Sequence, residues 1–142
     1  MAERRSTTRS VLLANGIRPL IEKRMADFKR GDIVKVPFPY TDRATRQSRP
    51  ALVISGPGLE DSHGLLWVLM VTSAENRGWP GDVGVTHLAT AGLPVASVIR
   101  TAKVATIDAG DAVRLGSIAA ATLRKVLQRL AETAGLVVLE KT

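Results

Sequence analysis

Short apolar segments separated by glycine, proline and polar residues are the feature that most constrains the fold of this chain. The clearest pair is Asp32-Ile-Val-Lys-Val-Pro and Ala51-Leu-Val-Ile, which are separated by two prolines and a polar stretch over residues 41–47. Such short runs are typical of β-strands, and the prolines exclude a continuous strand or helix between them. The pair therefore predicts two strands joined by a polar loop, with Arg49 where the loop re-enters the sheet.

The same pattern continues along the chain and predicts a mainly β (α+β) protein. The expected strands are Ile33–Pro37, Ala51–Ser55, Leu65–Thr72, Val83–Leu88, Ser97–Arg100 and Val104–Ile107. The third is apolar at nearly every position, as in a central strand covered on both faces. Residues 56–64 and 74–82 have the composition of loops. Short antiparallel strands of this kind indicate a small, curled β-sheet or barrel.

A helix is expected after the strands, over residues 118–134, with Ser117 as its cap and Gly135 as its stop. Its apolar stripe consists of Leu123, Val126, Leu127, Leu130 and Ala134, spaced as one helix face. Its other face is basic and is most simply a solvated surface.

Composition indicates a single soluble, cytoplasmic domain. The 142 residues are 45% hydrophobic and include no cysteine, which excludes a disulfide scaffold, thiolate metal sites and a cysteine nucleophile. No apolar run is long enough to suggest a membrane span. Residues 1–24 contribute four units of the net charge of +7, so the remainder is only mildly basic and permits a nucleic-acid partner without demanding one.

Residues 1–27 are expected to be a basic, flexible N-terminal extension. Met25 immediately precedes the first strand and reads as a natural chain start. A passive tail is the simpler interpretation, and a basic arm that contacts RNA or a partner is the alternative.

Five segments in order carry a resemblance to a known family. They are G-D-I-V-K-V-P-F-P-Y-T-D with R-P-A-L-V-I-S, then Val71-Thr-Ser, Gly92-Leu-Pro-Val-Ala-Ser-Val-Ile-Arg, Ala105-Thr-Ile-Asp, and Leu115-Gly-Ser-Ile. Together they resemble the PemK/MazF toxins, the ribonuclease members of toxin–antitoxin pairs, from about residue 28 to residue 136. The resemblance implies an SH3-like barrel with a C-terminal helix, and a toxin domain over residues 28–142.

Chemistry without a metal or cofactor is expected, because the sequence has no metal-ligand spacing, no phosphate-binding glycine loop and no nucleophile elbow. RNA cleavage by the adjacent 2′-hydroxyl is such a reaction, since the substrate carries its own nucleophile. It needs donors for the crowded phosphate, and the planar, permanently charged arginine fork suits that task.

The resemblance implies that Arg49 and Thr72 are catalytic. Arg49 matches the arginine of the family's R-P-x-L-V motif, and Thr72 matches the threonine at the end of its V-T-S segment. The structural alternatives are an arginine that braces a strand end and a hydroxyl that caps the local backbone.

RNA-binding residues are expected around this pair. They are Lys35, Arg43, Arg46, Ser73 and Arg77 in or beside the two flanking loops, and Ser97 and Arg100 in a family segment near the expected RNA groove. Trp79 or Tyr40 would offer a stacking surface for a base. Loop arginines are also the commonest surface charges, and the first loop, with Ala44-Thr-Arg-Gln, is bulkier than is usual in the family.

The proton donor and acceptor stay open at this stage. Arginine hardly ever loses its proton, so a base role for Arg49 is chemically awkward. Asp42, His63 and His87 are the titratable candidates, and each has a structural interpretation as well.

The partners implied by the resemblance are single-stranded RNA, a cognate antitoxin with an acidic tail, and a second copy of the chain in a homodimer. DNA would be contacted only through the antitoxin, and no membrane partner is expected. The alternative is a non-catalytic binding module like the related CcdB gyrase poisons. The C-terminal end, Leu136-Val-Val-Leu-Glu-Lys-Thr, lacks the aromatic anchors that such an interface would use.

Overall fold

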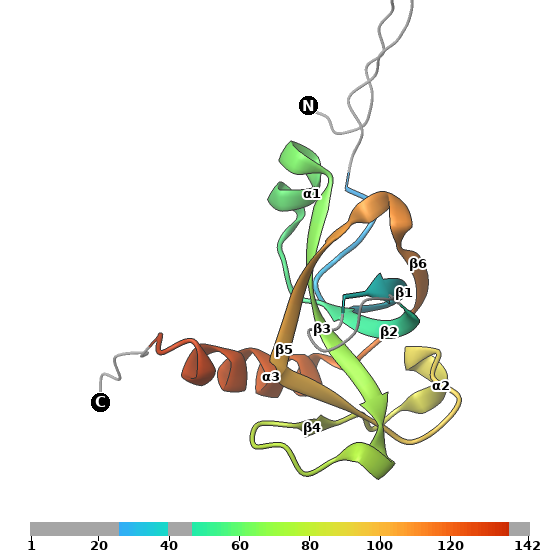
Figure 1. Cartoon of the computed structure of the whole chain (residues 1–142), viewed down its shortest axis with the longest axis vertical. Helices are drawn as coiled ribbons and strands as arrows, with labels where there is room; N and C mark the ends of the chain where they lie inside the picture. Colours follow the sequence, from blue (N-terminus) through green and yellow to red (C-terminus); the bar gives the residue numbers. More distant parts are fainter. Residues whose placement is uncertain (1–25, 40–46, 137–142) are drawn as a thin grey trace, which may run out of the picture.

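A computed structural model describes residues 26–39 and 47–136, in which six strands form one antiparallel sheet (Figure 1). The spatial order is β4-β5-β3-β2-β1-β6. The strands are β1 (Asp32–Phe38), β2 (Gln47–Val53), β3 (Leu65–Ser73), β4 (Val83–Gly84), β5 (Ser97–Asp108) and β6 (Val113–Ser117). The sheet curls into a half-barrel with a helix after its last strand, which confirms the predicted mainly β fold.

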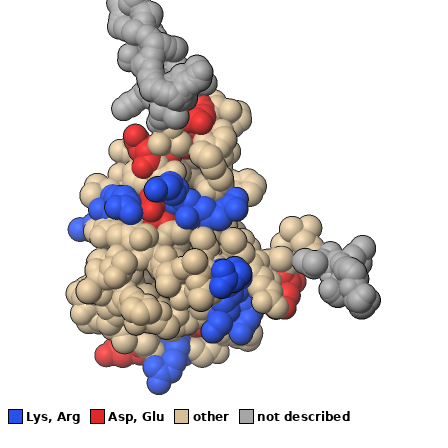
Figure 2. Space-filling model, turned by 180° about the vertical axis from the view of Figure 1, so that it is seen from behind, with Lys and Arg blue, Asp and Glu red and all other residues tan. Residues whose placement is uncertain are grey.

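Charges of both signs lie on the face of the molecule that Figure 2 shows. On the face turned away from the view of Figure 1, Lys and Arg side chains form a band across the middle of the molecule, with acidic side chains above it and near its edges (Figure 2). This mixed pattern agrees with the mildly basic character expected for the domain.

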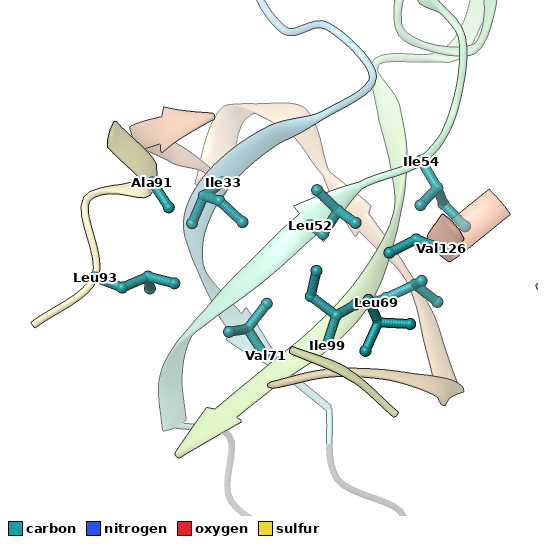
Figure 3. Close-up of a cluster of buried hydrophobic side chains, with 10 residues drawn as sticks. Ile33, Leu52, Ile54, Leu69, Val71, Ala91, Leu93, Ile99 and Val126 are labelled. Carbon is teal, nitrogen blue, oxygen red and sulfur yellow. The ribbon is translucent and has the colours of Figure 1, made fainter. Parts of the chain in front are cut away.

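Alternation along the strands gives the sheet two buried faces. In β1, Ile33 faces one apolar cluster, whereas Val34 and Val36 face another. The first cluster contains Leu52, Leu69 and Ile99 from neighbouring strands, together with Val126 from the C-terminal helix (Figure 3). Because successive side chains point to opposite faces, a short apolar strand can serve both clusters.

Two register shifts bend the sheet. One lies between Ile33 and Val34 where β1 pairs with β6, and the other lies between Leu69 and Met70 where β3 pairs with β5. Such bulges increase local twist. They explain how a sheet of only six strands curls around its two cores.

The C-terminal helix α3 (Ala120–Thr133) packs by the predicted stripe: Val126 is fully buried, although Ala134 is exposed. The predicted cap is wrong, since Ser117 ends β6 and the cap position is Ala119, without a side-chain hydrogen bond. Gly135 adopts a φ of +76°, in agreement with its predicted role as the stop.

Four other expectations are corrected. Residues 56–64, expected to be a loop, contain helix α1 (Pro57–His63), and Glu60 on that helix accepts the backbone N–H groups of Asp27 and Phe28. The two strands expected over residues 97–107 are one, β5, which continues through its bulge. The strand expected over residues 83–88 shortens to β4, because helix α2 (Leu88–Ala91) follows. Strand β6 was not predicted, because its sequence VRLGS has no run of apolar residues. It is a strand because it pairs with β1.

Helix α2 lies directly on β6 because Gly116 has no side chain. A Cβ at Gly116 would overlap the carbonyl oxygen of Thr90 and the backbone of Ala91. This close approach lets Ala91 of α2 pack into the first cluster.

Candidate functional site

The two predicted catalytic residues come from neighbouring strands. Strands β2 and β3 pair through Ala51↔Met70, and Arg49 and Thr72 each lie two residues further toward the same end of the sheet. Since side chains alternate with period two, both belong to the face that carries Ala51 and Met70. The start of β2 lies beside the tip of β3 in Figure 3. The sheet therefore brings these two residues to the same face, at one end of the central strands β2 and β3.

Arg49 is half-buried where β2 begins. It pairs with Val36 of β1, and its Nη2 donates a long hydrogen bond of 3.4 Å to Oε1 of Gln47. The backbone is thus fixed by the ladder, as predicted for an arginine at the point where the loop re-enters the sheet.

Thr72 is only 5% exposed, and its hydroxyl has a side-chain partner. Its Oγ1 accepts a hydrogen bond of 3.0 Å from Nδ2 of Asn76. Because this bond occupies a lone pair, the hydroxyl hydrogen stays available for donation to a ligand. Sequence reasoning missed Asn76.

A short turn places Asn76 over the end of β3. Ser73 caps the 3₁₀ turn Ala74–Asn76 by accepting the backbone N–H of Glu75 at 3.2 Å. A serine followed by Ala-Glu-Asn is a helix-start signal, so this turn was foreseeable from the sequence.

A hollow of about 650 Å³ opens next to this turn. Its lining residues are Ser73, Ala74, Glu75, Arg77, Val95 and Ala96. Its size falls in the range of ligand-binding clefts. Arg77 is exposed here, and its Nη1 donates to the carbonyl of Ala74 at 3.2 Å. Two of the predicted RNA-binding residues, Ser73 and Arg77, thus line one cavity beside Thr72.

Three other predicted RNA-binding residues are placed differently. Lys35 is exposed, but it alternates with Val34 and Val36 and so belongs to the opposite face of the sheet from Arg49. Ser97 is buried, and its hydroxyl donates to the carbonyl of Val95 at 2.8 Å. Lys35 therefore does not share the face of Arg49, and the Ser97 hydroxyl already donates to the backbone, while RNA contact by either residue stays a prediction.

Arg100, the third of these, is 5% exposed and forms an ion pair with Asp82, whose Oδ2 lies 2.9 Å from Nη2. Its guanidinium carbon lies 4.3 Å from the ring centroid of Trp79, which is itself 44% exposed. The cation is thus enclosed by protein groups instead of being presented to a ligand.

The histidines are both exposed. His63 ends α1, at the opposite end of β3 from Thr72, and the strand between them spans roughly 20 Å. It is therefore out of reach of Thr72 within one chain. His87 precedes α2, and its Nδ1 lies 3.0 Å from Oγ1 of Thr86. Tyr40, Asp42, Arg43 and Arg46 lie outside the described residues.

Within residues 26–39 and 47–136, no three His, Asp or Glu side chains are grouped as ligands for a metal ion. None of the helices in this described part is long and apolar enough to cross a membrane.

Known proteins share the family profile and the fold of this chain. The profile of the PemK-like, MazF-like toxins of type II toxin–antitoxin systems matches residues 29–134. A MazE–MazF complex from Deinococcus radiodurans is 25% identical with a TM-score of 0.61, over 77% of this chain and 96% of its own. MazF alone from the same organism is also 25% identical with a TM-score of 0.63, over 75% and 96%.

An endoribonuclease solved with its cognate antitoxin, from a mycobacterial species, shares the fold. Its TM-score is 0.62 at 18% identity, over 81% of this chain and 100% of its own. No curated protein sequence matches the chain significantly.

Proposed function

The chain belongs to the family of PemK-like, MazF-like toxins of type II toxin–antitoxin systems, and we propose that it is a sequence-specific endoribonuclease acting on single-stranded RNA. The observation that carries the proposal is the position of Arg49 and Thr72 on one sheet face, at the same end of strands β2 and β3 and next to a solvent-open hollow. Residues 28–142 would form the toxin domain, and residues 1–27 a basic extension.

The proposed reaction is a transesterification within the RNA. The 2′-oxygen attacks the adjacent phosphorus and loses its proton to a base, while the bond from phosphorus to the 5′-oxygen breaks. The leaving 5′-oxygen takes up a proton. The products are a 2′,3′-cyclic phosphate on one fragment and a 5′-hydroxyl on the other, and no metal ion is required.

Arg49 would stabilise the phosphorane-like transition state. In that state negative charge builds on the non-bridging oxygens, which a planar guanidinium can contact in pairs. Its place in the β2 ladder fixes the backbone, so the charge is held in position before the substrate binds.

Thr72 would donate its hydroxyl hydrogen to a phosphate oxygen. The amide of Asn76 supports this role, because it donates to Oγ1 and leaves the hydroxyl hydrogen for the ligand. Ser73 and Arg77 line the adjoining hollow and would hold the neighbouring nucleotide, with Arg43 and Arg46 as further proposed backbone contacts.

We place the protein in the cytoplasm as a homodimer with a cognate antitoxin. The likeness to a MazE–MazF complex supports the antitoxin partner. DNA would be reached only through that antitoxin.

The test compares wild-type protein with Arg49→Ala and Arg49→Lys on long single-stranded RNA in EDTA, with the 5′ ends of the fragments mapped. We expect discrete cuts with 5′-hydroxyl ends, slowed roughly 10²–10³-fold by Arg49→Ala. Arg49→Lys should recover little of the lost cleavage rate, because lysine lacks the planar, two-pronged guanidinium. Arg124→Ala, on the exposed face of α3, is the matched control and should cut normally.

Absence of cutting by a folded wild-type sample would overturn the ribonuclease proposal and favour the non-catalytic binding module. Cutting at the wild-type rate by Arg49→Ala would leave the activity standing and remove Arg49 from the site.

A further inference from the structure

Arg100 is a cation buried in the interior of the domain, where a charge is unfavourable unless other groups compensate it. Its side chain is 6% exposed and that of Asp82 is 9% exposed. Moving charges out of water is costly unless they are paired and hydrogen-bonded. Here Nε donates to Oδ1 of Asp82 at 3.1 Å and Nη2 donates to Oδ2 at 2.9 Å. The pair is thus a two-pronged contact that uses the planar shape of the guanidinium.

The contacts of Arg100 continue to the candidate site. Its Nη2 also donates to the backbone carbonyl of Asn76 at 2.6 Å, and Nδ2 of Asn76 donates to Oγ1 of Thr72 at 3.0 Å. The buried ion pair therefore holds the residue that in turn contacts the Thr72 hydroxyl. A series of contacts thus runs from Asp82 through Arg100 to the backbone of Asn76, and from the side chain of Asn76 to Thr72.

The loop that supplies Asp82 is itself folded around Arg100. Trp79 covers the guanidinium at 4.3 Å, and its backbone N–H lies 3.4 Å from Oδ2 of Asp82. Thr101 donates to the carbonyl of Gly81 at 3.0 Å on the same loop. Arg100 and Thr101 of β5 thus both anchor the loop, and Arg100 also touches the turn that carries Asn76.

We propose that Arg100, with Asp82, is a positioning residue that fixes Asn76 so that its amide directs the Thr72 hydroxyl toward the RNA phosphate. The inference rests on the proposed ribonuclease function. In this proposal Arg100 does not contact the RNA, contrary to the sequence-based prediction, but affects the reaction by holding Asn76.

Asn76→Asp gives the sharpest test, because it keeps the shape of the side chain and reverses the hydrogen bond. A carboxylate only accepts, so the Thr72 hydroxyl would donate to Asp and be lost to the phosphate. Arg100→Lys keeps the buried charge but cannot hold Asp82 and Asn76 with a planar fork. Thr101→Val is the matched control, since it removes another anchor of the loop on β5 without touching Asn76.

The experiment measures kcat and KM of the full chain on a fluorogenic single-stranded RNA that wild type cuts, in EDTA, with the melting temperature as a check of folding. We expect Asn76→Asp and Arg100→Lys to lower kcat about tenfold with KM little changed. Thr101→Val should keep the wild-type kcat. Adding Asn76→Ala to Thr72→Val should slow the enzyme no further, because both act on one hydroxyl.

RNA binding at several salt concentrations separates positioning from contact. When a residue that contacts phosphate loses its charge, the plot of log affinity against log salt concentration becomes shallower by roughly 0.7. We expect Arg100→Gln to leave that slope unchanged, whereas a shallower slope with a raised KM would overturn the inference. A wild-type kcat in Asn76→Asp, or an equal loss in Thr101→Val, would also overturn it while wild-type cutting continues. If wild type does not cut at all, the proposed function fails first and this inference fails with it.

Discussion

In the proposed reaction, the Thr72 hydroxyl donates its hydrogen to a phosphate oxygen, and its surroundings suit that role. The residue is buried at the tip of β3, and its oxygen accepts from Asn76. We therefore predict that Thr72→Val, which keeps the shape and removes the hydroxyl, lowers kcat roughly 10²-fold. Thr72→Ser should stay within about tenfold of wild type, since it keeps the donor. Single-turnover cleavage of a labelled RNA measures both.

The control for this pair is Thr106→Val, an exposed threonine on β5 that lies opposite Trp67, away from the tip of β3. It should cleave at the wild-type rate. Equal activities of Thr72→Val and Thr72→Ser would show that the hydroxyl takes no part in the reaction.

At the residue level, the positions of Arg49 and Thr72 were predictable because each motif coincides with a strand end, whereas their catalytic roles stay predictions. Arg49 and Thr72 lie at the ends of apolar runs, and the pairing of β2 with β3 follows from those runs. The environment of Arg100 was not predictable in this way. Its partners Asp82 and Asn76 lie 18 and 24 residues away in loops, and no periodicity reports such contacts.

Among the elements, the contact between α2 and β6 depends on the absence of a side chain at Gly116. Since a Cβ there would overlap the backbone of Thr90 and Ala91, we predict that Gly116→Ala lowers the free energy of unfolding by about 1–3 kcal/mol. Backbone atoms cannot rotate aside as a side chain can, so the helix must move. Urea denaturation followed by circular dichroism gives the value.

Gly110→Ala is the matched substitution, because a Cβ there meets no atom within 4 Å. Its unfolding free energy should stay within about 0.5 kcal/mol of wild type. A Gly116→Ala protein as stable as Gly110→Ala would mean that α2 does not rest on β6 in solution.

Elements with strong local patterns were predictable, and elements made by tertiary contact were not. The apolar run of β3 and the stripe of α3 both appeared as expected. By contrast, β6 contains Arg114 and Gly116 and becomes a strand because β1 offers it a ladder. Helix α1 has no buried residue, and Glu60 ties it to the backbone before β1. Pairing and tethering of this kind depend on partners distant in sequence.

At the scale of the whole molecule, charge is divided unevenly along the chain. Residues 1–24 contribute more than half of the net charge of +7, whereas the region that matches the toxin family begins at residue 29. Attraction to RNA phosphates grows with the number of cations, independent of the chemistry at the cleavage site. Binding strength and catalytic rate should therefore respond differently to removal of the N-terminal segment.

We predict that a chain starting at Met25 keeps the wild-type kcat within about threefold and cuts at the same positions, because Arg49, Thr72 and their strands are all retained. Loss of six basic residues should weaken binding to RNA and make the salt slope shallower. Fragment mapping and binding titrations on one RNA, at two salt concentrations, measure both quantities. A full-length chain in which those six residues and the two acidic ones, Glu3 and Glu22, are replaced by glutamine separates charge from length, and it should behave like the truncated chain. Altered cleavage positions in either protein would instead make the N-terminal segment part of RNA recognition, which is the basic-arm alternative.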